Sequence, residues 1–396
     1  MKKVYIVCIL SSLFLFLIAV SIQSIIIRED RNIKVGFVYV GDEMTPYTEN
    51  FIKAQRALEE KYGDKITTVV KYNVNEEDVY EPLMELVEEQ CDYIICPSYG
   101  YGPTVKEVAK QYPAIEFCVP TGDNANKDEV LTNYHNCMGE IYQGRYICGV
   151  VAGMKLKEMI DDGIITPAQA KIGYVAAFPY SEVISGYTSF YLGVQSVVPE
   201  ATMMVKYTDT WSNYTIEKKA AEELIDKGCI LISQHSDTTG PAVACENHSG
   251  DVPVYHVGYN QSMTEIAPAS SLVSCTVDYS HYFDQSVKAI MSNEPIETVV
   301  DATVNGQDTF AGFDKGWIKI LDVNKAIAAP RSEEMVKKIS DQFATSDYKV
   351  FVGDFTGTDP FDPNDKVDLS YGYEENKNSS SPTFHYVLDD VITVIE

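Results

Sequence analysis

Aromatic and short polar residues follow most of the apolar, strand-like runs in this sequence. Side chains at the carboxyl ends of parallel strands commonly face a ligand, so these residues are the first candidates for a binding site. Rings stack on the faces of a flat ligand, while carboxylate, amide and hydroxyl groups bond its edges. The segments with this composition are residues 41–47, 97–102, 176–180, 208–211, 234–237 and 258–260.

Catalytic and metal-binding motifs are missing from these segments. His235, Ser236 and Asp237 are the residue types of a catalytic triad, but a triad is assembled from separate elements and adjacent side chains cannot converge. Residues 100–102 lack the rest of a dinucleotide fingerprint. The acidic run 359–365 lacks the central glycine and the closing glutamate of an EF-hand loop, so we expect a solvated loop. The sequence therefore predicts ligand binding rather than catalysis, with no cofactor and no metal.

Two rings show how a functional and a structural interpretation compete. Phe178 fits equally well as a core residue or as a ring beside the ligand. Trp211 lies among Thr, Asp, Ser and Asn residues, and this polar setting favours a position in the binding site.

The elements that must position these residues are repeated once along the chain. Lys34-Val35-Gly36-Phe37-Val38 recurs as Lys171-Ile172-Gly173-Tyr174-Val175, 137 residues later (171 minus 34). Val70-Lys71-Tyr72 recurs as Val205-Lys206-Tyr207, 135 residues later (205 minus 70). Two further matches, near Cys91 and Glu116, keep the same order. This duplication predicts two similar lobes.

Each copy alternates strand-like runs with amphipathic stretches, as parallel βαβ units do. Residues 49–62 and 183–198 are the first predicted helix of each copy. Because ligands bind at the carboxyl ends of parallel strands, two such sheets that face each other would enclose one cleft. The fold class is therefore α/β, with two three-layer lobes, parallel sheets and a hinge.

After the second copy, the sequence predicts a helix over 282–291, a strand over 298–304 and a final helix over 383–395. We expect the first lobe over 33–155, with part of 283–330 returning to it. The second lobe is expected over 156–282, and residues 331–396 form an extension that packs on the lobes. Residues 1–32 are expected to be a cytoplasmic stub and a membrane anchor.

The N-terminal segment and the overall charge indicate where the chain works. The run from Val4 to Ile27 has no charged side chain and is long enough to span a bilayer. Lys2 and Lys3 precede it, so the remainder is placed outside the cytoplasm. An uncleaved anchor is favoured over a cleaved signal, for which residues 19–21 offer a weak site. A net charge of −27 argues against nucleic acid as a partner.

Nine cysteines in an extracytoplasmic chain would usually suggest disulfides. None forms a Cys-x-x-Cys pair, and most lie inside apolar runs, for example Cys96 and Cys118. We expect buried thiols that behave as small apolar side chains.

Four stretches of the chain resemble the basic membrane protein family, the substrate-binding lipoproteins of ABC importers that include a purine nucleoside receptor. The resemblance covers essentially the whole chain after residue 33, and its second-copy block is quite specific. The matching stretches are residues 94–101, 140–153, 172–179 and 234–237.

This resemblance implies a type I periplasmic-binding-protein fold and a purine nucleoside as ligand. It places two rings around the base, at Phe51 and Trp211, and a carboxylate that bonds the base at Asp42. The loop 98–101 and Asn260 fall where further polar contacts lie. The full set of candidate ligand-binding residues is Asp42, Tyr47, Phe51, Ser98, Tyr99, Gly100, Phe178, Trp211, His235, Asp237, Asn260 and Asp278.

The sequence departs from the family in two respects. Nucleoside-binding members have an aspartate where this chain has Asn260 and a lysine near Val277, and both hold the sugar. A free purine base or another flat heterocycle is therefore as plausible as a nucleoside. In addition, no cysteine follows the apolar run, so the usual lipid anchor would be replaced by the helix 4–27 itself.

We therefore expect an extracytoplasmic substrate-binding protein at the cell membrane that delivers a purine nucleoside or base to a separate ABC permease and its ATPase. One alternative is a receptor domain that senses a flat heterocycle and signals to a membrane partner. A nucleoside hydrolase is a further alternative. A neighbouring gene for a permease would favour the importer, and consumption of the bound purine would favour the hydrolase.

Overall fold

The computed structural model describes residues 32–345, 348–377 and 379–396. The predicted membrane segment, Val4 to Ile27, lies outside these ranges. Within them, no helix combines the length and the apolar character that are needed to cross a bilayer.

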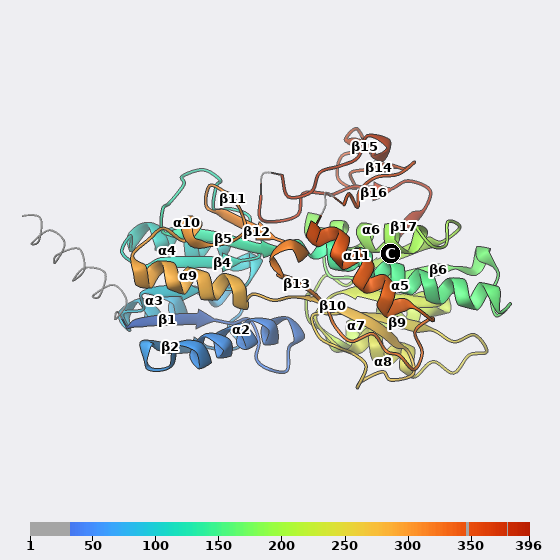
Figure 1. Ribbon diagram of the computed structural model, residues 1–396, viewed down its shortest axis with the longest axis horizontal. Coiled ribbons are helices and arrows are strands. Elements are labelled where there is room, and N and C mark those ends of the chain that lie inside the picture. Colours follow the sequence, from blue (N-terminus) through green and yellow to red (C-terminus); the bar gives the residue numbers. More distant parts are fainter. Residues whose placement is uncertain (1–31, 346–347, 378) are drawn as a thin grey trace, which may run out of the picture.

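Two lobes lie side by side, each built on a twisted sheet with helices packed against it (Figure 1). In the described part of the chain, the first sheet has seven strands in the order β11-β12-β5-β4-β3-β1-β2, and only the β11–β12 pair is antiparallel. Its strands are β1 (Ile33–Val38), β2 (Ile66–Lys71), β3 (Tyr93–Ile95), β4 (Glu116–Pro120), β5 (Tyr134–Gly139), β11 (Thr303–Asn305) and β12 (Asp308–Ala311).

The second sheet repeats this arrangement among the residues described. Its order is β13-β10-β9-β8-β6-β7-β17, and only the β10–β13 pair is antiparallel. The order β7-β6-β8-β9-β10 matches β2-β1-β3-β4-β5, as the duplication predicts. The strands are β6 (Lys171–Ala176), β7 (Thr202–Tyr207), β8 (Leu231–His235), β9 (Tyr255–Tyr259), β10 (Ser271–Val277), β13 (Ile318–Ile320) and β17 (Ile392–Ile395).

The helices begin where the amphipathic patterns predict them, within a few residues. The predicted helices 49–62, 183–198 and 282–291 correspond to α2, α6 and α9. The helices are α2 (Pro46–Tyr62), α3 (Tyr80–Glu88), α4 (Gly102–Gln111), α5 (Ile141–Asp161), α6 (Ser181–Gln195), α7 (Tyr214–Asp226), α8 (Gly240–Glu246), α9 (Ser280–Ser292), α10 (Ile296–Val299) and α11 (Ser332–Thr345).

One continuous apolar core joins the inner faces of both lobes. It includes Phe37 of β1, Tyr174 of β6 and the ring of Phe283 on α9, all fully buried. The central strands β1 and β6 are buried on both faces, which explains why they read as nearly continuous apolar runs rather than as alternating patterns.

The chain crosses between the lobes three times in the described residues. The crossings lead from β5 to α5, from β10 to α9 and from β12 to β13. All three lie at neighbouring strands near one edge of the two sheets, and this geometry is that of a hinge.

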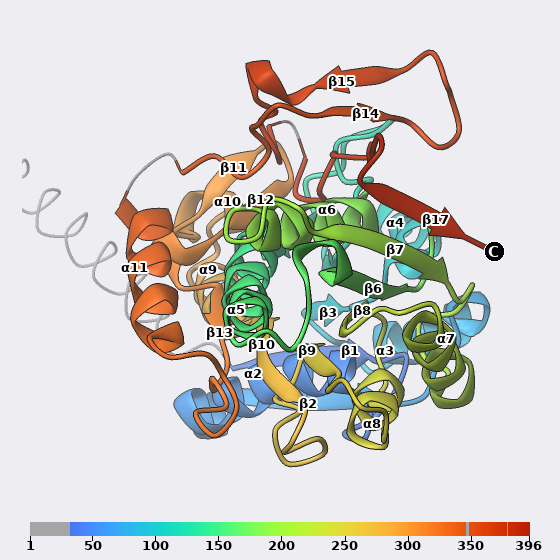
Figure 2. The ribbon, with the colours of Figure 1, turned by 90° about the vertical axis from the view of Figure 1, so that its right-hand side faces the viewer.

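The residues beyond α11 are not helical, so the prediction of a final helix over 383–395 is wrong. This segment contains β16 (Val387–Leu388) and β17, and β17 extends the second sheet beside β7. β16 pairs with β14 (Thr356–Thr358), which also pairs with β15 (Lys366–Asp368), and this small sheet stands above the second lobe (Figure 2). The segment is rich in β-branched residues, and tertiary strand pairing outweighs its apolar periodicity.

The predicted strand 298–304 is also wrong in its first half. Ile296–Val299 forms the short helix α10, and pairing with β12 starts only at Thr303. A single turn of helix after Pro295 is compatible with β-branched residues because few turns must accommodate them.

Glycines allow α5 and α6 to pack closely. A Cβ at Gly149 would overlap the carbonyl oxygen of Phe190, and a Cβ at Gly193 would overlap that of Tyr146. The backbones of the two helices therefore touch directly, at the point where α5 enters the second lobe.

Replacement of Gly149 by alanine should destabilise the protein by about 1–3 kcal/mol. Alanine favours an isolated helix by about 1 kcal/mol, but the clash with the backbone of α6 outweighs this gain. Urea unfolding measures the change. Lys157→Ala, at an exposed position of α5, is the control and should change stability little. A Gly149→Ala variant at least as stable as the parent would contradict the close contact.

Glu140 lies in the first crossing, directly before α5. It accepts hydrogen bonds from Gln143 Nε2 at 2.8 Å and from the Tyr142 hydroxyl at 3.3 Å. Burial, with a smaller contribution from nearby Asp314, raises the pKa of Glu140 from 4.5 to about 7. Between about pH 4.5 and about pH 7, Glu140 keeps its proton in the folded chain and loses it in the unfolded chain. Its titration therefore lowers the stability of the folded protein as the pH rises through this range.

Glu140→Gln should therefore stabilise the protein at about pH 8 by about 1–3 kcal/mol and should have little effect near about pH 4. Chemical unfolding at both pH values measures the difference. Glu81→Gln, which removes an exposed carboxylate, serves as the control. The same gain at both pH values would show that packing rather than titration is responsible.

Candidate functional site

A cavity of about 470 Å³ lies between the lobes, at the carboxyl ends of the strands of both sheets. Seven of the predicted residues line it, from segments that follow β1, β3, β6, β7 and β8. They are Tyr47, Ser98, Tyr99, Phe178, Trp211, His235 and Asp237.

Aromatic rings form one wall of this cleft. Phe178 and Trp211 meet edge to face with centroids 5.5 Å apart, and Tyr180 stacks on Phe178 at 5.2 Å. Tyr99 of the first lobe approaches Tyr180 of the second at 5.7 Å. Rings from both lobes therefore meet at the mouth of the cleft.

Glu76 is held against the loop after β3. Its Oε1 accepts hydrogen bonds from the Ser98 hydroxyl and, at 3.0 Å, from the Gly100 backbone N–H. A Cβ at Gly100 would overlap this carboxylate. Gly100 does not line the cleft, so its role in the site is to leave room for Glu76. On the same lobe, the Tyr47 hydroxyl and Thr121 Oγ1 are 3.2 Å apart.

His235 is the last residue of β8 and lines the cleft from the second lobe. Its Nε2 is 3.4 Å from Glu182 Oε1, and its ring packs 4.7 Å from that of Tyr259. Burial lowers the pKa of His235, so the imidazole is neutral. A Cβ at Gly186 would overlap this ring, and the glycine thus makes room for the histidine.

Asp237 and Asn260 form a hydrogen-bonded chain that reaches the other lobe. Asn260 Nδ2 donates to Asp237 Oδ1 at 3.2 Å, and Asn50 Nδ2 on α2 donates to Asn260 Oδ1 at 3.0 Å. Burial raises the pKa of Asp237, and Glu217 and Glu182 raise it further. The amide nitrogen and the amide oxygen of Asn260 both form hydrogen bonds with protein groups, and Asn260 does not line the cavity.

Buried Glu217 supports the loop that carries Asp237. Its Oε2 accepts hydrogen bonds from the Ser236 hydroxyl at 2.7 Å and from Thr238 N–H at 3.1 Å, and its Oε1 accepts from Asn213 N–H at 2.9 Å. Burial nevertheless raises the pKa of this carboxyl. The end of β8 is therefore fixed to the start of α7.

Phe51 and Asp42, both expected beside the base, lie outside the cavity. Phe51 is fully buried, and its ring stacks on Tyr279 with centroids 4.4 Å apart. Asp42 closes a turn, since its carboxylate accepts hydrogen bonds from Met44 N–H at 2.9 Å and from Asn73 Nδ2 at 3.2 Å. These contacts lower the pKa of Asp42.

Asp278 and Val277 also lie away from the cleft. Asp278 Oδ1 accepts hydrogen bonds from the backbone N–H of Ser280, at 3.0 Å, and from its hydroxyl, so it holds the first turn of α9. Val277 is buried at the hinge, where it packs against Gly139.

Several lining residues were not among the predicted ones, above all Glu76 and Glu182. Glu76 follows β2, and β2 repeats the strand that precedes Trp211. The duplication itself thus marked residues 73–76 as the counterpart of 208–211. Glu182 is the second residue of α6 and follows the candidate segment 176–180 by two residues, and no motif distinguishes it from a surface residue.

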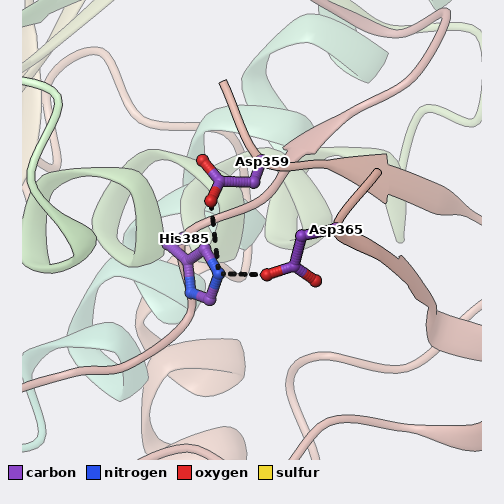
Figure 3. A group of neighbouring side chains, drawn as sticks. All are labelled: Asp359, Asp365 and His385. Atoms are coloured by element: carbon purple, nitrogen blue, oxygen red, sulfur yellow. Dashed lines mark hydrogen bonds and ion pairs between the residues drawn. The ribbon is translucent and has the colours of Figure 1, made fainter. Parts of the chain in front are cut away.

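A second group of chemically active side chains lies in the C-terminal extension (Figure 3). The acidic loop was predicted to be solvated, and its ends, Asp359 and Asp365, meet His385. The imidazole Nε2 is 3.2 Å from Asp365 Oδ2 and 3.9 Å from Asp359 Oδ2, while Nδ1 is 2.7 Å from the Thr383 carbonyl oxygen. The three side chains offer ligand atoms within 4.8 Å of one another, close enough to hold a metal ion. A protonated imidazole that donates to the carboxylates would satisfy them as well as a metal ion would.

Known proteins share this architecture. A purine-binding protein of Brucella abortus is 29% identical over 74% of this chain and 75% of its own length. A putative ABC transporter glucose-binding protein of Haloferax volcanii is 28% identical over 66% of this chain and 62% of its own. The solved structure of an ABC transporter solute-binding protein from Conexibacter woesei covers 79% of this chain and 96% of its own, with a TM-score of 0.58 and 16% identity.

The TM-score indicates a shared two-lobed fold, and at this identity it indicates nothing further. The model of the family described as "ABC transporter substrate-binding protein PnrA-like" matches residues 33–347, which include every residue that lines the cleft and every strand of the two large sheets except β17. The chain therefore belongs to the PnrA-like (Bmp) family of ABC transporter substrate-binding proteins.

Proposed function

We propose that this protein captures a purine base or nucleoside in the cleft between its lobes and delivers it to an ABC permease outside the cytoplasm. Membership of the substrate-binding family supports the transport role, and the printed name of the Brucella relative supports a purine. The bound molecule leaves chemically unchanged, because the protein acts by binding.

The observation that carries this proposal is the composition of the cleft. Phe178 and Trp211 contribute aromatic surface that suits a flat ligand, while Glu76, Ser98 and Asp237 offer polar atoms for its edges. A cavity of about 470 Å³ is within the usual range for a small ligand.

Closure of the hinge would couple binding to recognition by the permease. Contacts from both lobes make the closed state more favourable when ligand is present. Asn50 and Asn260 already join the lobes by a hydrogen bond of 3.0 Å, next to the cleft. A ligand that binds Tyr47 on one lobe and Trp211 on the other would add to this contact.

A free base is supported at least as well as a nucleoside. The family resemblance assigned the sugar to positions that are Asn260 and Val277 here. The amide of Asn260 is engaged by Asn50 and Asp237, and Val277 is buried at the hinge. Neither side chain is available to hold a ribose.

The full-length protein should bind at least one purine with a dissociation constant of micromolar or below, as calorimetry would measure. Hypoxanthine, adenine, guanine and their nucleosides form the panel, and glucose is included because of the name of the Haloferax relative. Recovery of the unmodified purine after incubation separates binding from hydrolysis. If glucose binds and no purine does, the purine proposal is wrong. If cells that lack the permease no longer take up the ligand but still respond to it, the receptor alternative would be favoured.

Trp211→Ala should weaken purine binding by about 10- to 100-fold, because the loss of one stacked ring costs about 1–3 kcal/mol. Calorimetry with the best ligand of the panel measures the change. Tyr371→Ala removes a ring that is 87% exposed and distant from the cleft, and it should leave affinity unchanged. Equal affinity of the parent and the Trp211→Ala variant would remove Trp211 from the binding site.

A further inference from the structure

The described residues that line the cleft include acidic side chains but no lysine or arginine. Four of these residues are carboxylates. The carboxylates are Glu76 from the first lobe and Glu182, Asp209 and Asp237 from the second. His235 adds no positive charge, because burial lowers its pKa. A ligand in this cleft therefore meets a negative potential.

Glu76 is fixed with one oxygen available. Its Oε1 accepts two hydrogen bonds, from Ser98 and from the backbone of Gly100, whereas no described residue donates to Oε2. The absence of a side chain at Gly100 allows this position. The carboxylate is thus held in the cavity wall rather than extended into solvent.

Glu182 lines the same cleft from the opposite lobe. The residue lies in the first turn of α6, where the helix dipole favours a negative charge. Its side chain is 15% exposed, and its contact with His235 involves Oε1 at 3.4 Å. Glu182 also raises the pKa of the neighbouring Asp237.

The nearby cation Arg145 does not reach the ligand. Its guanidinium carbon lies 3.9 Å from the centre of the Tyr259 ring, and the side chain is fully buried. Tyr259 lines the cleft, whereas Arg145 does not. The ring of Tyr259 therefore separates the positive charge of Arg145 from the cleft.

Acidic side chains of both lobes line the same cleft, Glu76 from one side and Glu182 and Asp237 from the other. Burial raises the pKa of Tyr47, which also lines the cleft, and these three side chains raise it further. Closure without a ligand brings the like charges of Glu76 and Glu182 closer together in a site from which water is partly removed, and such an approach is unfavourable.

We propose that Glu76 and Glu182 select a ligand without negative charge, whose N–H groups bridge the two carboxylates across the cleft. The pair rejects anionic relatives of the ligand, such as nucleotides, and resists closure of the empty cleft. This inference rests on the proposed purine function and specifies the charge class of the ligand. Neutral purines have ring N–H and amino donors for such a bridge.

Calorimetry on the full-length protein tests the selection with two matched pairs. Hypoxanthine is neutral and urate is an anion at neutral pH, and adenosine is compared with its monophosphate. The neutral member of at least one pair should bind about 100-fold more tightly than the anion, because like-charge contacts cost several kcal/mol. In the Glu76→Gln, Glu182→Gln double variant, this ratio should shrink by about tenfold or more.

Glu77→Gln is the control, since it removes an exposed charge next in sequence to Glu76. It should leave the ratio unchanged. An anion that binds as tightly as its neutral partner would overturn the proposal, as would a ratio that is the same in the double variant and in the parent.

Failure of the purine proposal is distinguished by a second measurement that needs no purine. Without ligand, the double variant should have a smaller radius of gyration than the parent in low-salt X-ray scattering, and added salt should reduce the difference. Equal radii at low salt would overturn the repulsion between the lobes. If no purine binds, hits from a library of cationic, neutral and anionic heterocycles should all lack negative charge, and an anionic hit would again overturn the selection.

Discussion

Three crossings of the chain at one hinge hold the carboxyl ends of two parallel sheets opposite each other, and the site depends on this constraint. Parallel strands end at a common edge, so each lobe alone presents only half of a binding surface. The crossings lie beside β5, β10 and β12, where the core continues from one lobe into the other. Gly149 and Gly193 bring α5 and α6 into backbone contact there. The hinge is consequently a packed structure rather than a linker, and relative motion must occur by small rotations about it.

Buried carboxylates carry an electrostatic cost in this architecture. Glu217 is satisfied by three protein donors, whereas Asp237 receives one from Asn260. Burial raises the pKa of both groups, which indicates that neither is fully compensated. If a buried carboxylate had only a structural role, the protein would be more stable with a paired cation beside it or with an apolar residue in its place. Carboxylates that remain undercompensated beside a cavity are instead typical of ligand contacts.

The sequence was sufficient to predict the two lobes and the sheet edge at which the cleft lies. The repeated strands predicted that the two sheets would be alike, and side chains that follow strands, such as Trp211 and Asp237, do line the cleft. Sequence-based predictions were wrong where tertiary contacts determine the position of a side chain or the pairing of a strand. Phe51 has the residue type of a stacking ring, but its position on α2 turns it toward Tyr279 and the shared core. Residues 383–395 have a helical apolar pattern, yet strand pairing with β7 determines the fold of Ile392–Ile395.

Some functional positions in this site are defined by the absence of a side chain, which explains why they are difficult to recognise in a sequence. Gly100 follows a strand and was assigned to the ligand, but its contribution is to let the Glu76 carboxylate approach the loop backbone. Gly186 similarly admits the His235 ring beneath Glu182. In both lobes, therefore, a glycine positions an acidic edge of the cleft. The acidic character of the cleft depends on these two local fits, and neither is visible in residue type or spacing alone.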